Sequence, residues 1–197
     1  MSGIRIERLT GARLSAHLPD VARLRIEVFR AFPYLYVGDL DYEARYIASF
    51  AASPNALVVA AFDGDAVVGA STAAPMAHQM DEVTAPFRAR GDDLATMFYF
   101  GESVLLSNYR GRGAGVRFFE EREAHARVCG AAAAAFCAVV RSADHRARPA
   151  DYVPLDDFWR HRGFAPQPGL ICHIAWKEIG GTEESPKAMQ FWTKRLR

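Results

Sequence analysis

The sequence predicts an α/β fold, with α+β character, in which one mixed β-sheet carries helices on both faces. Two observations lead to this prediction. Short apolar runs of strand length alternate with stretches in which apolar residues recur at helical spacing. An apolar run at 96–106 is followed by a helical stretch and a second apolar run at 131–140, which indicates parallel strands joined by a right-handed crossover. The predicted order is β-αα-β-β-β-α-β-α-β-β.

The first half of the chain is predicted to form a strand, two helices and a β-hairpin. Pro33 disfavours helical geometry at Phe32, so the first helix is expected to end there. Asp39 or Asp41 can cap the second helix, and Asp63-Gly64 suits the hairpin turn. The five elements are expected at 4–8, 18–32, 39–50, 56–62 and 66–72.

The second half begins with a polar stretch at 75–93, which is expected to be a long irregular loop because prolines and a glycine interrupt it. A second polar loop is expected at 141–152, and Gly163 suits the C-terminal cap of the short helix that follows. The remaining strands and the short helix are expected at 96–106, 131–140, 154–162, 170–176 and 188–196.

The composition limits the classes of partner. The 197 residues fit one domain spanning 1–197, and 50% of them are apolar, which is enough for a sizeable core. The 24 basic and 23 acidic residues give a net charge of +1. This balance gives no support for nucleic acid or a membrane surface as the main partner.

The cysteines and the N-terminus indicate the compartment. Cys129, Cys137 and Cys172 are odd in number and lack metal-type spacing, so they are predicted to be buried reduced thiols. The N-terminal residues lack an apolar signal core, and no apolar run approaches the roughly 18 residues of a membrane span. We therefore expect a soluble, cytoplasmic protein.

The glycine-rich turn Arg110-Gly111-Arg112-Gly113-Ala114-Gly115 follows the strand at 96–106 and opens a helix. Glycines at alternate positions let backbone N–H groups turn inward, and a helix start adds unpaired N–H donors and the positive end of its dipole. Two arginines add positive charge. Together these features predict an anion site, suited to a phosphate or pyrophosphate.

The same turn resembles a motif of the GCN5-related N-acetyltransferase superfamily, [Gln/Arg]-x-x-Gly-x-[Gly/Ala]. Arg110, Gly113 and Gly115 fill its three defining positions, and the segment 159–164 resembles the family's aromatic-x-x-x-Gly-Phe signature. The predicted element order also resembles that of the family. The resemblance implies an acyl-CoA N-acyltransferase fold in which parallel strands four and five splay apart.

The resemblance further implies acetyl-CoA, or another acyl-CoA, as the acyl donor. Its pyrophosphate would lie on the N–H groups of 110–115, and its pantetheine arm would pair with the backbone of Ser103, Val104 and Leu105. Other phosphate motifs fit less well, because a Walker loop needs Gly-Lys-Ser/Thr and a dinucleotide fingerprint needs a glycine where Val116 stands. A nucleotide-phosphate binder stays an alternative.

Glu102 is the leading candidate for the general base, because it is the one acid in an apolar strand. The family alignment makes the Leu105 N–H the candidate oxyanion donor. Many members use a tyrosine as the general acid, but Trp159 stands at that position here. Tyr152 is a candidate substitute, and a thiol with a pKa of about 8.5 can also leave without an acid.

The acceptor side is expected to include the aromatic residues at the break after the first helix, Phe32, Tyr34 and Tyr36. Arg25 and Glu27 could add charge there, as could the loop after strand five, where His145 could contact substrate. A solvated loop is the alternative for the 141–152 segment. The histidines, cysteines and acids show no metal-ligand spacing, so no metal is predicted.

These features favour transfer of an acetyl group from acetyl-CoA to a small-molecule or peptide amine, by direct attack in a ternary complex. The alternative on the same fold is a non-catalytic acyl-CoA-binding or regulatory module, which the tryptophan at 159 motivates. The acceptor and the acyl length are open. The oligomeric state is also open, a homodimer included.

Overall fold

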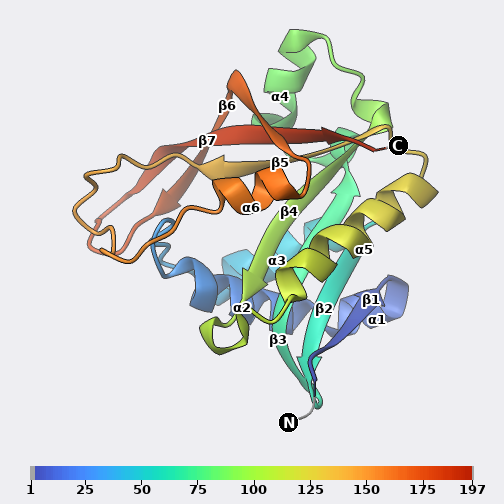
Figure 1. The fold of residues 1–197 in the computed structure, drawn as a ribbon, viewed down its shortest axis with the longest axis horizontal. Coiled ribbons are helices and arrows are strands. Elements are labelled where there is room, and N and C mark those ends of the chain that lie inside the picture. Colours follow the sequence, from blue (N-terminus) through green and yellow to red (C-terminus); the bar gives the residue numbers. More distant parts are fainter. Residues whose placement is uncertain (1–2, 197) are drawn as a thin grey trace.

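The computed structural model describes residues 3–196. Its centre is a seven-stranded sheet with the order β1-β2-β3-β4-β5-β7-β6 (Figure 1). β4 and β5 are parallel, and the other neighbouring strands are antiparallel, so the predicted mixed sheet is confirmed. The strands are β1 Arg5–Leu9, β2 Leu57–Asp63, β3 Ala66–Pro75, β4 Met97–Leu105, β5 Ala133–Val139, β6 Ala165–Lys177 and β7 Glu184–Arg195.

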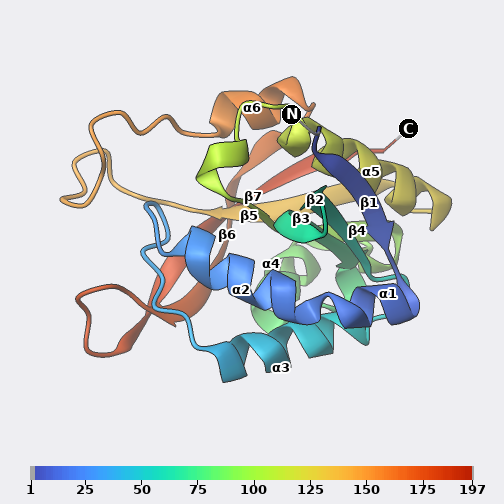
Figure 2. The ribbon, with the colours of Figure 1, turned by 90° about the horizontal axis from the view of Figure 1, so that it is seen from below.

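Helices cover both faces of the sheet, as predicted. α5 and α6 lie on one face, and α2 and α3 lie on the other with α1 and α4 (Figures 1 and 2). Leu24 of α2 and Ile47 of α3 are fully buried against β2 and β3, while Phe118 and Phe119 of α5 are buried on the opposite face. The helices are α1 Gly11–Ala16, α2 Leu18–Phe29, α3 Leu40–Ala51, α4 Asp81–Arg90, α5 Ala114–Val128 and α6 Asp156–His161.

The prediction of an irregular loop at 75–93 was wrong, because this stretch contains α4. Pro86 lies inside that helix and removes one of its backbone hydrogen bonds. Because a proline disfavours a helix interior, the sequence predicted a loop here. Burial of Val83 and Phe87 offsets this loss, and Gly91, at φ +86°, ends the helix. Acidic residues in the first turn and arginines in the last turn also suit the helix dipole.

The remaining boundaries differ by smaller amounts. α1 was not predicted, since it is short and buries one residue, Leu14. α2 ends at Phe29, before the Phe32-Pro33 bond, which is cis. Asp39 is the cap of α3, where its side chain accepts a hydrogen bond from the Tyr42 N–H at 2.8 Å. β6 and β7 are longer than predicted. β6 already begins at Ala165, which pairs with Thr193, and β7 already begins at Glu184, which pairs with Lys177 beside the turn that joins the two strands.

β4 and β5 separate after a short paired segment, as the splayed strands were predicted to do. Their register covers three residue pairs, from Met97–Ala133 to Tyr99–Ala135. Beyond these pairs β5 continues to follow β7 as far as Val139, whereas the second half of β4 follows β3 (Figure 1). The divergence frees one backbone edge of β4 at 100–105, directly before the glycine-rich turn.

Within residues 3–196, no helix is both long and apolar enough to cross a bilayer.

Candidate functional site

A β-bulge in β4 determines where Glu102 points. The register between β3 and β4 shifts between Ser71 and Ala73, opposite Gly101. A Cβ on Gly101 would lie 2.4 Å from Thr72 Oγ1, so only glycine fits there. The same hydroxyl accepts a hydrogen bond from the Glu102 N–H at 3.2 Å. Because a bulge changes the face that successive side chains take, Glu102 is directed toward α2.

The Glu102 carboxylate lies in a buried ionic network. Its residue is 5% exposed, and its Oε2 accepts a hydrogen bond from Arg25 Nη1 at 2.6 Å. Arg25 Nε also donates to Glu43, which is fully buried and in turn accepts from the Tyr36 hydroxyl at 2.8 Å. The second carboxylate oxygen, Glu102 Oε1, is buried without a hydrogen-bond partner among residues 3–196. The network therefore joins the loop before α3 to α3, α2 and β4.

Arg25 is the cation at the centre of this network. Burial opposes its charge, but the nearby carboxylate of Glu102, together with Tyr46 and Glu43, raises the pKa of Arg25 above its ordinary value. The guanidinium also lies 4.4 Å from the ring centre of Tyr46 and 5.3 Å from that of Phe29. Arg25 therefore stays charged at neutral pH.

The sequence pointed to Arg25 and Glu27 as charges near the acceptor side, and the structure separates the two. Arg25 faces the interior, whereas Glu27 is on the surface, 3.5 Å from Arg23. Sequence reasoning missed Glu43. It lies four residues before the buried Ile47, on the apolar side of α3, and an acid at such a position signals a buried ion pair.

A second missed residue, Arg122, places another cation on the opposite face of the sheet. It is 1% exposed and lies between the rings of Phe100 and Phe119, at 4.5 and 4.7 Å from their centres. Its Nη1 donates to the Thr72 carbonyl at 3.4 Å. Burial lowers the pKa of Arg122 to about 9, although the Glu102 carboxylate acts in the opposite direction. Arg122 follows two buried phenylalanines at helical spacing, which is the signal that could have revealed it.

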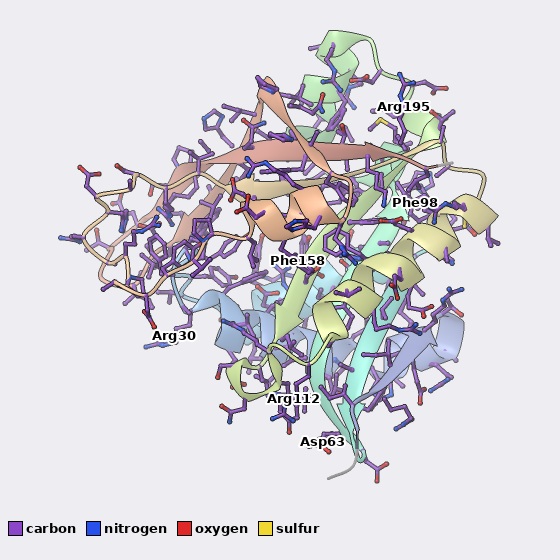
Figure 3. The ribbon with its side chains drawn as sticks, in the orientation of Figure 1. Arg30, Asp63, Phe98, Arg112, Phe158 and Arg195 are labelled. Carbon is purple, nitrogen blue, oxygen red and sulfur yellow. The ribbon has the colours of Figure 1, made fainter. Side chains whose placement is uncertain are left out.

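The glycine-rich turn has the geometry of an anion cradle. Gly111 and Gly113 have φ of +73° and +84°, in the left-handed region that glycine tolerates, and α5 begins directly after Gly113. No side chain of the described chain caps this helix start, so its first N–H groups are left for another acceptor. Arg110 and Arg112 are exposed beside it, and Arg112 is labelled in Figure 3. The turn therefore offers backbone donors, a helix dipole and two cations to an anion.

The segment before the turn lies at the opening between the splayed strands. Ser103, Val104 and Leu105 pair with β3 through Ser71, Ala70 and Gly69. Ser103 is exposed, Val104 is buried and Leu105 is half-buried. Their other backbone edge faces the side from which β5 has diverged, so an extended group could pair there as an added strand does. The contact between this backbone edge and a pantetheine arm, which the family resemblance implies, stays a prediction.

The residues predicted for the acceptor side form two groups. Phe32, His145 and Tyr152 come together, with the ring of Phe32 5.6 Å from that of His145 and 4.7 Å from that of Tyr152. Tyr34 instead packs on Trp176 at 5.9 Å. Tyr36 turns inward, to the buried ionic network. The loop at 141–152 therefore meets the break after α2.

Trp159 and Tyr152 have different environments. Trp159 packs 5.1 Å from both Phe136 and Trp192, so it belongs to the core under α6. Tyr152 is half-buried, and burial raises the pKa of its hydroxyl above the ordinary 10.0. A phenol that keeps its proton at neutral pH has the state that a general acid needs.

The cysteines are free, and their predicted burial was correct for one of them. Cys172 is buried, whereas Cys129 and Cys137 are half-buried. Cys137 lies on the splayed part of β5, with its sulfur 3.1 Å from the Tyr99 hydroxyl. Among residues 3–196, no group of three or more His, Cys, Asp or Glu is arranged to hold a metal ion.

Neither a protein-family model nor a curated protein sequence matches this chain. Solved structures match its fold. A ribosomal-protein-alanine N-acetyltransferase from Brucella melitensis has a TM-score of 0.62 at 17% identity, covering 98% of this chain and 99% of the other. A candidate acetyltransferase from Salmonella typhimurium, solved with its cofactor acetyl-CoA, has a TM-score of 0.61 at 12% identity, covering 100% and 95%.

A third structure, a GNAT-family acetyltransferase from Streptococcus pneumoniae, has a TM-score of 0.57 at 12% identity and covers 98% of this chain and 99% of its own. At these identities the likeness establishes the fold. The fold predicted from the two sequence motifs, with its splayed parallel strands, is thereby confirmed.

Proposed function

We propose that this chain, which has the fold of the GCN5-related N-acetyltransferases, is an N-acetyltransferase that moves an acetyl group from acetyl-CoA to the amine of a small molecule or peptide. The observation that carries the proposal is a juxtaposition along β4. A buried carboxylate, a freed backbone edge and an anion cradle follow one another between Glu102 and Gly115. In our proposal the reaction is carried out by one N-acetyltransferase domain, 1–197, in the cytoplasm.

The donor would be held by backbone and charge. The cradle fits a pyrophosphate because its glycines leave open space, since a Cβ on Gly111 or Gly113 would meet no atom within 4 Å. The N–H groups of 110–115 and the two arginines would hold the phosphates. The Salmonella typhimurium structure, solved with acetyl-CoA, supports this choice of ligand.

The transfer needs a neutral amine, a stabilised oxyanion and a leaving thiolate. In our proposal Glu102 Oε1 accepts the proton that the amine loses, and the amine nitrogen attacks the thioester carbonyl directly. The Leu105 N–H stabilises the oxyanion, which in other enzymes is worth about 3–4 kcal/mol. The C–S bond then breaks, and the CoA thiolate leaves. Phe32, Tyr34 and His145 would line the acceptor side, and Tyr36 would act through the ionic network.

Calorimetry with acetyl-CoA tests the proposal first. We expect a Kd of about 50 μM or below, within the range of enzyme KM values, and release of free thiol with at least one amine in a panel of amino acids, polyamines and peptide N-termini. Binding without thiol release across that panel would favour the non-catalytic module instead. Tight ATP or NAD binding that CoA does not displace would favour the nucleotide binder.

Tyr152→Phe should lower kcat by about a hundredfold or more if Tyr152 protonates the leaving thiolate, because general acids contribute about 10²–10⁴-fold. The variant keeps the ring that contacts Phe32, so the packing is retained. Steady-state thiol release at saturating acetyl-CoA measures the effect. Tyr109→Phe is the control, since its hydroxyl bonds to Asp63 at 2.7 Å. A change below twofold in Tyr152→Phe would mean that the thiolate leaves without this acid.

A further inference from the structure

Glu102 has two oxygens in unequal environments. Oε2 is bound to Arg25 at 2.6 Å, whereas Oε1 is buried and has no hydrogen-bond partner among residues 3–196. A buried carboxylate oxygen without a partner is unfavourable, and a catalytic role is one of the reasons for which folded proteins retain such atoms. The asymmetry between the two oxygens has a structural origin, which lies in Arg25.

Arg25 is held in place from two sides. Its Nε is bound to Glu43 and its Nη1 to Glu102, so the planar guanidinium spans two carboxylates that come from different elements. Glu43 is fixed in turn by the Tyr36 hydroxyl, and the Tyr46 ring covers the guanidinium. Little freedom remains for the Arg25 side chain, which is 12% exposed.

We propose that Arg25 is a positioning residue for acetyl transfer, which holds Oε2 of Glu102 and leaves Oε1 as the oxygen that meets the acceptor amine. This inference rests on the proposed function of Glu102 as the base. Arg25 cannot take the proton itself because it stays a cation. Because Arg25 occupies Oε2 of Glu102, Oε1 is the oxygen that is left for the amine. Glu43 also binds Arg25, which keeps the guanidinium from turning away from Glu102.

The other charged and titratable groups near Glu102 leave this role to Arg25. Arg122 lies across the sheet, stacked between two phenylalanines, and donates to backbone carbonyls. Burial, with a contribution from the Glu102 charge, raises the pKa of Tyr34 and of Tyr46, but neither hydroxyl makes a hydrogen bond to Glu102 in the described part of the chain. Within residues 3–196, Arg25 is the cation in direct contact with the carboxylate.

Three variants test the inference with the full chain. Arg25→Gln removes the charge, and Arg25→Lys keeps it but cannot span both carboxylates. Arg23→Gln is the control on the same helix, because Arg23 forms surface pairs with Asp20 and Glu27. We expect kcat with the amine found in the panel to fall at least 30-fold in Arg25→Gln and less in Arg25→Lys. The Kd for acetyl-CoA should change less than threefold, and Arg23→Gln should change neither.

A double-variant cycle separates positioning from general stability. If Arg25 acts through Glu102, adding Arg25→Gln to a Glu102→Gln protein should lower kcat by less than twofold further. The same 30-fold loss in both backgrounds would overturn the inference, as would unchanged kcat in Arg25→Gln. If the Arg25→Gln variant does not fold, the same double-variant cycle is measured with Arg25→Lys.

A crystal structure of the Arg25→Gln variant, which removes the charge that binds Glu102, gives an answer that does not depend on activity. We expect the Glu102 carboxylate to turn away from the position it has in the native chain. A carboxylate that keeps its position would overturn the inference even if the native protein transfers acetyl groups. Conversely, a displaced carboxylate in a protein that transfers none would contradict the proposed function, and what is left of the inference is that Arg25 holds the Glu102 carboxylate in place.

Discussion

Replacing Glu102 by glutamine is expected to lower kcat for acetyl transfer by about 10²–10⁴-fold, the range that general acid–base groups contribute. Glutamine has nearly the shape of glutamate, and its side-chain oxygen can still accept the hydrogen bond from Arg25. It cannot take a proton from the amine. The measurement is steady-state thiol release with a reactive amine, together with the Kd for acetyl-CoA, which should change less than threefold.

Glu27→Gln is the matched control for this variant. Glu27 is a glutamate on α2, the helix that carries Arg25, but it lies on the surface and pairs with Arg23. We expect its kcat to stay within twofold of the native value. If Glu102→Gln also keeps its activity, Glu102 is a structural partner of Arg25, and another group or a water molecule removes the amine proton.

The sequence predicted those parts of the site that lie within one continuous segment of the chain. The strand, the turn at 110–115 and the start of α5 follow one another in the chain, so the backbone geometry there depends on local glycines and a local helix start. Glu102 stood out for the same reason, as one acid in an apolar strand. The order of the seven strands also followed from local patterns, as did the helices other than α1 and α4.

What the sequence could not predict depends on contacts between distant segments. Glu43 and Glu102 are 59 positions apart, and they meet through Arg25 only after α2 and α3 pack on the sheet. The bulge at Gly101 depends on the fit against Thr72 in the neighbouring strand. α4 was missed because the penalty of Pro86 is visible in the sequence, whereas the burial that offsets it is not.

Replacing Gly113 by valine is expected to weaken acetyl-CoA binding at least 100-fold, or about 2.7 kcal/mol. Two effects combine. The backbone at φ +84° is in a region that a β-branched residue rarely adopts. In addition, a Cβ there would meet no protein atom within 4 Å, so the new side chain would project into the open space that we assign to the pyrophosphate. Calorimetry with acetyl-CoA measures the loss.

Gly130→Val is the control that separates these two effects. Gly130 has a φ of +80°, and a Cβ added to it would also meet no atom within 4 Å, but it follows the opposite end of α5. Both variants should therefore unfold at a similar, lowered temperature, because the backbone strain is alike. If only Gly113→Val loses acetyl-CoA, the cradle binds the ligand. Equal losses in the two variants would show that strain in α5 is the cause, and Gly113 would then have no direct part in binding.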